Sequence, residues 1–135
     1  MQVNPYLTFN GNCEEAFKTY QRILGGEIAA MIPYEGTPGA EGMPPERRKQ
    51  IIHARLVGNG IVPMESDAHD RYEPMKGFSV TVNTKKPAEA ERIFNALADK
   101  ATVALSLGET FFTTKFGMLT DKFGTPWMIV CEKAQ

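Results

Sequence analysis

His53 and Arg55 stand two residues apart in a short alternating segment, where they offer an imidazole and a guanidinium. The residues that alternate with them are apolar, namely Ile52, Ala54 and Leu56. In a strand, residues two apart share one face, so His53 and Arg55 are expected on the side away from the packed core. His53 could act there as a general base or as a hydrogen-bond donor to a ligand. The alternative is a histidine bonded within the sheet or at a subunit contact.

His69 lies among carboxylates in the segment Glu65-Ser66-Asp67-Ala68-His69-Asp70. Histidine with Asp and Glu is a typical set of metal ligands. No helical or strand spacing brings these side chains to one face, so the segment is interpreted as solvated loop residues. Ser66 and Glu65 are the exception, because they end a predicted strand whose rim could face a ligand.

No nucleophile motif of the Gly-x-Ser-x-Gly kind occurs. Cys13 opens a predicted helix, whose dipole could lower the pKa of its thiol. A buried apolar role is favoured, since Cys13 shares a helical stripe with Ala16 and Phe17. Cys131 is expected in the core. Two isolated cysteines form no disulfide framework, which favours a reduced, cytoplasmic setting.

Length and charge exclude several classes of protein. The chain has 135 residues, 42% hydrophobic and 23% charged, with a formal net charge of −1. This balance is typical of a globular protein, and we expect one domain, residues 1–135. Apart from the short stretch Arg47-Arg48-Lys49, no basic run occurs, so nucleic acid is not an expected partner. No segment is apolar enough for a membrane span, and Met1 to Tyr6 does not resemble a signal peptide.

The chain repeats one order of elements. In its first half we predict a strand at Pro5 to Asn10, a helix capped by Asn12 that ends at Gly25, and three strands. These are Glu27 to Pro33, Gln50 to Val57, and Gly60 to Glu65. The second half follows with a strand at Phe78 to Val82 and a helix that starts near Pro87. Its last strands are Thr102 to Leu107, Thr110 to Leu119, and Pro126 to Cys131.

Two βαβββ modules therefore follow one another, residues 1–67 and 76–132, with a linker at 68–75. Two helices among eight strands favour the α+β class over a doubly wound sheet. The irregular stretch Tyr34 to Arg48 is rich in Pro and Gly. A loop of this length in a compact domain is often functional, so we interpret it as a flap over a pocket; the alternative is a surface loop without a role.

Three segments resemble PhnB-like proteins of the glyoxalase/bleomycin resistance/extradiol dioxygenase (vicinal oxygen chelate) superfamily. They are Asn4 to Tyr20, Ile52 to Leu56, and Phe116 to Ile129. The resemblance implies paired βαβββ modules, a curved cup-shaped mixed sheet with helices outside, and a homodimer. Some PhnB-like sequences are labelled as ubiquinone-pathway methyltransferases, but no Gly-rich loop with a following acidic residue marks a Rossmann-type nucleotide site.

Metal-dependent relatives carry His or Glu on the first and last strands of each module. The matching places in this chain fall near Pro5 or Tyr6, Met64, Gly77 or Phe78, and Met128. None of these residues is a His, Asp or Glu, so we predict no metal site and no cofactor, with a divalent metal as the alternative.

We therefore predict a small-molecule-binding PhnB-like protein, either a binder or an enzyme without the usual metal. The alternatives are a metal-dependent lyase, isomerase or dioxygenase, and a resistance protein that sequesters a drug between dimer subunits. Lys115 and Arg55 could hold an anionic group; the alternative is two solvated charges at the rim. The expected ligand contacts are His53, which is also the catalytic candidate, with Arg55, Met64, Ser66, Phe78, Phe112, Lys115, Trp127 and Met128.

Overall fold

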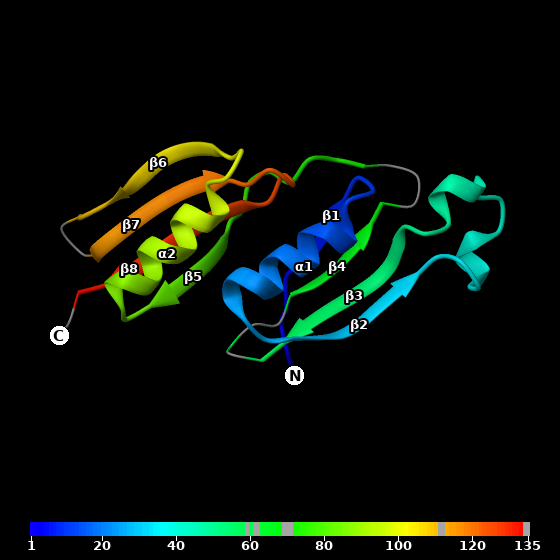
Figure 1. Ribbon diagram of the computed structural model, residues 1–135, viewed down its shortest axis with the longest axis horizontal. Coiled ribbons are helices and arrows are strands. Elements are labelled where there is room, and N and C mark those ends of the chain that lie inside the picture. Colours follow the sequence, from blue (N-terminus) through cyan, green and yellow to red (C-terminus); the bar gives the residue numbers. More distant parts are fainter. Residues whose placement is uncertain (59, 61–62, 69–71, 111–112, 134–135) are drawn as a thin grey trace. The chain divides into compact units, whose positions relative to one another are not determined.

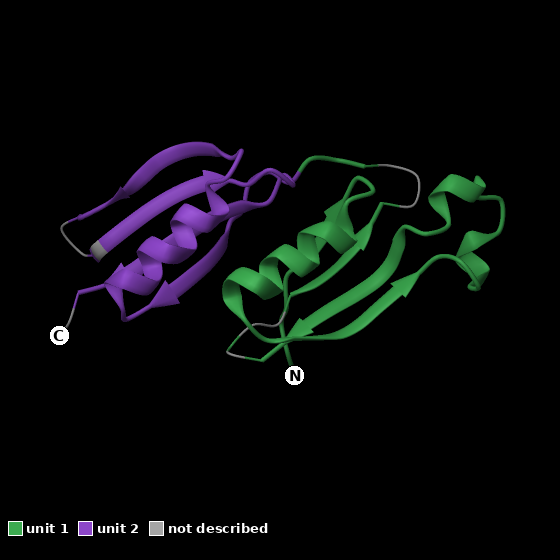
Figure 2. Ribbon diagram, viewed as in Figure 1, with its two compact units in different colours: residues 1–74 green, residues 75–135 purple. Residues whose placement is uncertain are grey.

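The computed structural model describes residues 1–58, 60, 63–68, 72–110 and 113–133. The chain divides into two compact units, residues 1–74 and 75–135 (Figure 2). The division falls inside the linker expected at 68–75. Each unit contains one helix and one four-stranded sheet, and each is described by itself.

Unit 1 has the order βαβββ, and its helix crosses one face of the sheet (Figure 1). Its sheet has the order β1-β4-β3-β2, in which β1 runs parallel to β4 and the other neighbours are antiparallel. The elements are β1 (Tyr6–Phe9), α1 (Cys13–Leu24), β2 (Glu27–Pro33), β3 (Ile51–Val57) and β4 (Met64–Asp67).

Unit 2 repeats this arrangement with the sheet order β5-β8-β7-β6, and β5 runs parallel to β8. The predicted α+β class, with two βαβββ modules, is thereby confirmed. Neither helix of the described ranges is long and apolar enough to cross a membrane. The elements are β5 (Val80–Thr84), α2 (Pro87–Leu97), β6 (Thr102–Gly108), β7 (Thr113–Thr120) and β8 (Pro126–Glu132).

The fourth and fifth strands are among those that begin at later residues than the sequence pattern predicts, and each of these two begins beside a proline. The fourth strand was expected at Gly60 to Glu65, and residues 61 and 62 of that range lie outside the described residues. The described strand β4 begins directly after Pro63, where Met64 donates its N–H to the carbonyl of Pro5. Proline has no N–H to give to a ladder. The fifth strand was expected from Phe78 but begins at Val80, which pairs with Trp127, the residue after Pro126. Phe78 therefore lies outside the sheet.

The core of unit 1 forms where the apolar stripe of α1 covers the sheet. Leu7 and Phe9 of β1 and Ala54 and Leu56 of β3 are almost fully buried, as the alternation of these strands predicts. The burial of these apolar side chains contributes most of the free energy that stabilises the unit. The helix contributes Cys13, Ala16, Phe17, Tyr20 and Ile23.

In unit 2, α2 lies close to the sheet because Gly117 has no side chain. A Cβ atom at Gly117 would lie 2.7 Å from Cε2 of Phe94, far inside van der Waals contact. The ring of Phe94 thus takes the space that a larger residue on β7 would occupy. The predicted apolar face of this helix is confirmed, since Ala90, Ile93, Phe94 and Leu97 are all buried.

A buried carboxylate, rather than the predicted Asn12 cap, satisfies the start of α1. The Asn12 side chain makes no capping hydrogen bond. Instead, Oδ1 of Asp67 accepts the backbone N–H of Cys13 at 2.9 Å, and its Oδ2 accepts that of Ile51 at 2.8 Å. One side chain at the end of β4 therefore joins the helix N-terminus to the start of β3. The positive end of the helix dipole also favours the negative charge of Asp67.

The long loop between β2 and β3 is hydrogen-bonded to the end of β4 and to the residue after it. It contains two short 3₁₀ turns, Pro38–Ala40 and Pro45–Arg47. The Tyr34 hydroxyl donates to the carbonyl of Asp67 at 3.1 Å, and Arg47 donates to the carbonyl of Ala68 at 3.3 Å. Burial, together with the charge of Asp67, raises the pKa of Tyr34, so its phenol keeps the donated proton. The expected role of this loop as a flap stays a prediction.

Replacing Asp67 with Asn should lower the free energy of unfolding by about 2–3 kcal/mol, because an amide N–H would face one of the two buried donors. Urea unfolding followed by circular dichroism measures this change. Asp99→Asn is the matched control, since Asp99 forms an exposed pair with Lys122 at 3.5 Å, and such pairs contribute little. Equal midpoints for the two variants would contradict the bridging role of Asp67.

Cys13 should lower the stability of the protein at high pH. Burial, and then the charges of Glu65 and Asp67, raise the pKa of its thiol well above the ordinary value of 9.0. At pH values below the ordinary pKa, the thiol is protonated in both the folded and the unfolded state. Above it only the unfolded chain releases the proton, so the free energy of unfolding should fall by up to about 1.4 kcal/mol per pH unit.

Urea midpoints between pH 8 and 10.5 test this expectation, with Cys13→Ala as the reference that lacks the thiol. The wild type should lose more stability over this range than the variant does. Parallel pH profiles for the two proteins would show that Cys13 ionises in the folded state as readily as in the unfolded one.

Candidate functional site

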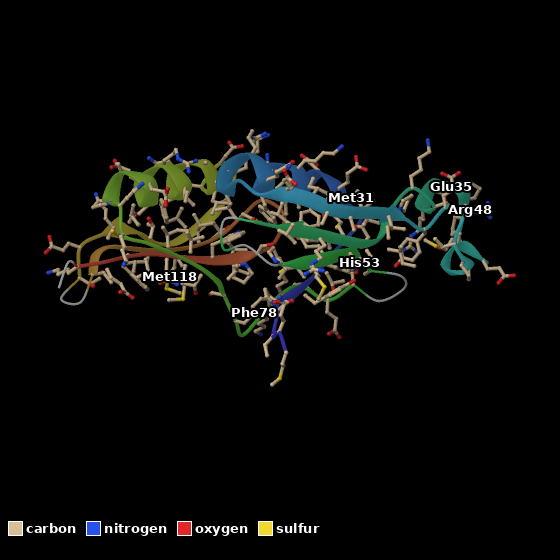
Figure 3. The ribbon with its side chains drawn as sticks, turned by 90° about the horizontal axis from the view of Figure 1, so that it is seen from below. Met31, Glu35, Arg48, His53, Phe78 and Met118 are labelled. Atoms are coloured by element: carbon tan, nitrogen blue, oxygen red, sulfur yellow. The ribbon has the colours of Figure 1, made fainter. Side chains whose placement is uncertain are left out.

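The side of the unit 1 sheet opposite α1 gathers the polar and aromatic side chains of four strands. Strand partners share a face, and one row across the sheet runs Tyr6, Met64, Arg55, Ala30. A second row pairs Thr8 with Ser66 and His53 with Ile32. We name this side the open face of unit 1. Figure 3 shows His53 on this side and Met31, the partner of buried Ala54, on the other.

Two rings lie together on the open face. The ring centroids of Tyr6 and His53 are 6.2 Å apart, and their planes meet at 23°. Tyr6 remains 48% exposed and Ile32 43% exposed. Tyr6 and Ile32 lie on the two edge strands of this sheet, and large apolar side chains that stay exposed on one face often mark a binding surface.

Arg55 lies between Met64 and Ala30 on the open face. Its Nε is buried and has no hydrogen-bond partner among the described residues. No ion pair is formed by Arg55 within that part of the chain either. A buried N–H without an acceptor costs free energy, more so on a charged group. The guanidinium is therefore suited to an acceptor from outside the chain.

The nearest carboxylates of β4 belong to the other face. Glu65 and Asp67 are buried with Leu7 and Phe9, their partners on β1. Ser66 alternates with them and lies on the open face, although it is only 9% exposed. Four of the predicted contacts are thus brought together, namely His53, Arg55, Met64 and Ser66.

The contacts predicted in the second module do not share one face. Met128 pairs with Met118 on the side of the unit 2 sheet away from α2, and Figure 3 shows Met118 on that side. Phe78 precedes β5 and is 44% exposed. Lys115 pairs with Cys131 in the register of Gly117, which places it on the side that α2 covers.

Trp127 is a core residue held by a buried carboxylate. It is 3% exposed, and its indole N–H donates to Oδ2 of Asp121 at 2.8 Å. The other oxygen of Asp121 accepts the backbone N–H groups of Phe123 and Thr125 at 2.9 and 3.0 Å. Trp127 and Met128 are adjacent in β8, so they point to opposite faces. The expectation that both contact one ligand does not agree with this alternation.

Two of the singled-out residues, Phe112 and His69, lie outside the described residues. Sequence reasoning omitted Tyr6, Thr8 and Ile32 from the site. The alternation in Pro5 to Asn10 already separates Tyr6 and Thr8 from buried Leu7 and Phe9. The missing signal was the parallel pairing of β1 with β4, which brings Tyr6 beside Met64.

The donor set does not fit the metal that the superfamily resemblance implies. The matching places hold Tyr6, Met64, Phe78 and Met128, which supply no imidazole and no carboxylate. Within the described ranges, no three residues of the types His, Cys, Asp and Glu gather as a possible metal site. Transition metals in proteins are usually held by three or four such ligands.

Comparison with known proteins assigns the chain to a family. A sequence model of the family described as 3-demethylubiquinone-9 3-methyltransferase matches residues 1–130. Protein YjdN of Escherichia coli (strain K12) is 35% identical over 146 residues, which cover 100% of this chain and 98% of that protein.

Solved structures agree with the fold. Protein PA1353 from Pseudomonas aeruginosa has a TM-score of 0.90 at 46% identity, with 99% of each chain covered. A putative 3-demethylubiquinone-9 3-methyltransferase, PhnB protein, from Bacillus cereus has a TM-score of 0.83 at 25% identity, with 97% of this chain and 99% of that chain covered.

A glyoxylase/bleomycin resistance protein/dioxygenase domain from Frankia sp. EAN1pec has a TM-score of 0.67 at 11% identity, with 98% of each chain covered. At that identity the likeness concerns the fold alone. The resemblance to PhnB-like proteins and the predicted fold are both confirmed.

Replacing Asp121 with Asn should loosen the pocket of Trp127 and lower the free energy of unfolding by about 1–3 kcal/mol. Trp127 is the one tryptophan of the sequence, so its fluorescence reports the change directly. We expect an emission maximum at short wavelength in the wild type and a shift to longer wavelength in the variant. Asp99→Asn is the control, and identical spectra for all three proteins would contradict the role of Asp121.

Proposed function

The chain belongs to the family described as 3-demethylubiquinone-9 3-methyltransferase, and from this premise we propose that it is a small-molecule-binding protein whose ligand lies on the open face of unit 1. The carrying observation is the exposed, stacked Tyr6–His53 pair beside Met64 and Arg55. Binding sites typically combine apolar and aromatic surface with a few placed polar groups. The open face has this composition, whereas the α1 side is closed by packing.

Each residue has a distinct part in this proposal. Tyr6, Ile32 and Met64 supply apolar surface, and the flexible thioether of Met64 adapts to the shape of a ligand. His53 supplies a hydrogen-bonding nitrogen and is the candidate general acid or base if the ligand is transformed. The Ser66 hydroxyl is a further donor and acceptor. The homodimer expected from the resemblance remains part of the proposal.

Methyl transfer is the second candidate, because the matching family and the Bacillus cereus protein carry that description. The turn after β1 contains Asn10, Gly11 and Asn12, with a single glycine. A Rossmann-type nucleotide site would instead need a Gly-rich loop at this place. Incubation with 3-demethylubiquinone and a sulfonium methyl donor, followed by mass spectrometry, tests this candidate directly.

A fragment screen by thermal shift tests the proposed site. Compounds that raise the melting temperature of the wild type should lose most of that effect in His53→Ala and in Tyr6→Ala, because both remove part of the ring surface. Val103→Ala is the control, since Val103 is similarly exposed (42%) but lies in unit 2. Undiminished shifts for every compound in both variants would exclude the open face as the site.

The same screen also distinguishes a metal-dependent protein from a metal-free one, and an enzyme from a sequestering protein. Repeating it with EDTA and with Ni²⁺, Zn²⁺, Mn²⁺ or Fe²⁺ examines the metal alternative. A stoichiometric metal site that requires His53 would contradict the proposal. Mass spectrometry of bound compounds after incubation distinguishes an enzyme, which returns an altered compound, from a sequestering protein, which returns it unchanged.

A further inference from the structure

We propose that the ligand of the open face is an aromatic oxyanion, in which a carboxylate or phosphate is attached to a planar ring system and binds Arg55. This inference rests on the proposed function and adds the chemical class of the ligand. It begins from the buried Nε of Arg55, which has no hydrogen-bond partner within the described ranges. A guanidinium presents its N–H groups as a planar fork that matches two oxygens of a carboxylate or phosphate.

The charges around Arg55 favour an anion from outside the chain. On the described strands of unit 1, the carboxylates of β4 face α1, and Asp67 is occupied by the N–H groups of Cys13 and Ile51. Glu27 lies on the same side of the sheet as Arg55, but it pairs with Val57, at the end of β3, and forms no ion pair with Arg55. His53, two residues along β3, is the other basic side chain on the open face.

The row beside Arg55 sets the size and shape of the ligand. Met64 separates Arg55 from Tyr6, so these two residues are two strand spacings apart, about 10 Å. An oxyanion at Arg55 therefore places an attached ring system over Met64 and toward the exposed ring of Tyr6. On the other side of Arg55 the row ends in Ala30, whose side chain is too short to cover the half-buried Arg55 side chain. Flat rings suit this path because they stack on the rings of Tyr6 and His53.

Three matched probes test the proposal by isothermal titration calorimetry, namely 2-naphthoate, 2-naphthyl phosphate and the neutral 2-naphthamide. The acids should bind the wild type at least about tenfold more tightly than the amide, as expected for a charge-assisted bidentate pair. The stronger of the two acids identifies the oxyanion. This comparison needs no variant, so it is independent of any effect of substitution on folding.

Variants of Arg55 then locate the effect. Arg55→Met should remove most of the acid preference, because the two acids lose a charge-assisted pair and therefore lose more affinity than the amide does. Arg55→Lys should keep part of the acid preference, since lysine has the positive charge but lacks the planar fork of N–H groups. Arg22→Met, on the exposed side of α1, is the control and should behave as the wild type. Circular dichroism and the melting temperature establish that each variant is folded.

Equal affinity for acids and amide, or no saturable binding of either acid, would overturn the oxyanion proposal. The same holds if Arg55→Met keeps the full acid preference. Binding of the amide that is lost in Tyr6→Ala, without any preference for acids, would overturn the oxyanion and leave the proposed function standing. Binding of all probes that is insensitive to both Tyr6→Ala and Arg55→Met would overturn the proposed function itself.

Discussion

The carboxylate of Asp67 holds unit 1 together at the point where three segments meet. Its two oxygens accept one N–H from the start of α1 and one from the start of β3, while the backbone carbonyl of the same residue accepts the Tyr34 hydroxyl. Asp67 therefore helps to set both the register of β3 against β4 and the position of the long loop. A charged group can be buried here because each of its oxygens is hydrogen-bonded.

The two sides of the unit 1 sheet have different roles. The side that faces α1 contains the apolar core and the buried carboxylates, so its residues determine stability. The open face contains Tyr6, His53 and Arg55, which are not needed to cover the core. In unit 2 a second buried carboxylate, Asp121, organises the turn between β7 and β8 and fixes Trp127. Each unit thus contains an Asp with both carboxylate oxygens hydrogen-bonded, at a point where the backbone leaves the sheet.

Much of the fold follows from local patterns in the sequence. The alternation in β3 correctly placed Ala54 and Leu56 in the core and His53 and Arg55 opposite them, and the stripe of α2 is buried as predicted. The predicted start of β5 was wrong, because the strand pairs only from Val80, opposite the residue that follows Pro126. The Asn12 cap was wrong because its competitor, Asp67, is 54 residues away from Cys13, and such a partner leaves no local signal.

The site could be predicted most directly where one strand carries it. His53 and Arg55 belong to one strand, and alternation suffices to pair them. Tyr6 joins them only through the parallel pairing of β1 with β4, which no short-range pattern shows. Trp127 and Met128 were both expected to contact the ligand from their strand positions, although neighbours in a strand point to opposite faces. Its indole N–H has a buried partner in Asp121, and that partner places it in the core.

The separation of faces also bears on how proteins of this kind diverge. Residues on the open face can be exchanged without disturbing the packing beneath α1, since strand alternation isolates the two sets. New ligand preferences can therefore arise by single substitutions that the fold tolerates, whereas substitutions at Asp67 or Gly117 are constrained by the structure itself. A family built on this scaffold is expected to keep its anchors and to vary its open face from one member to the next.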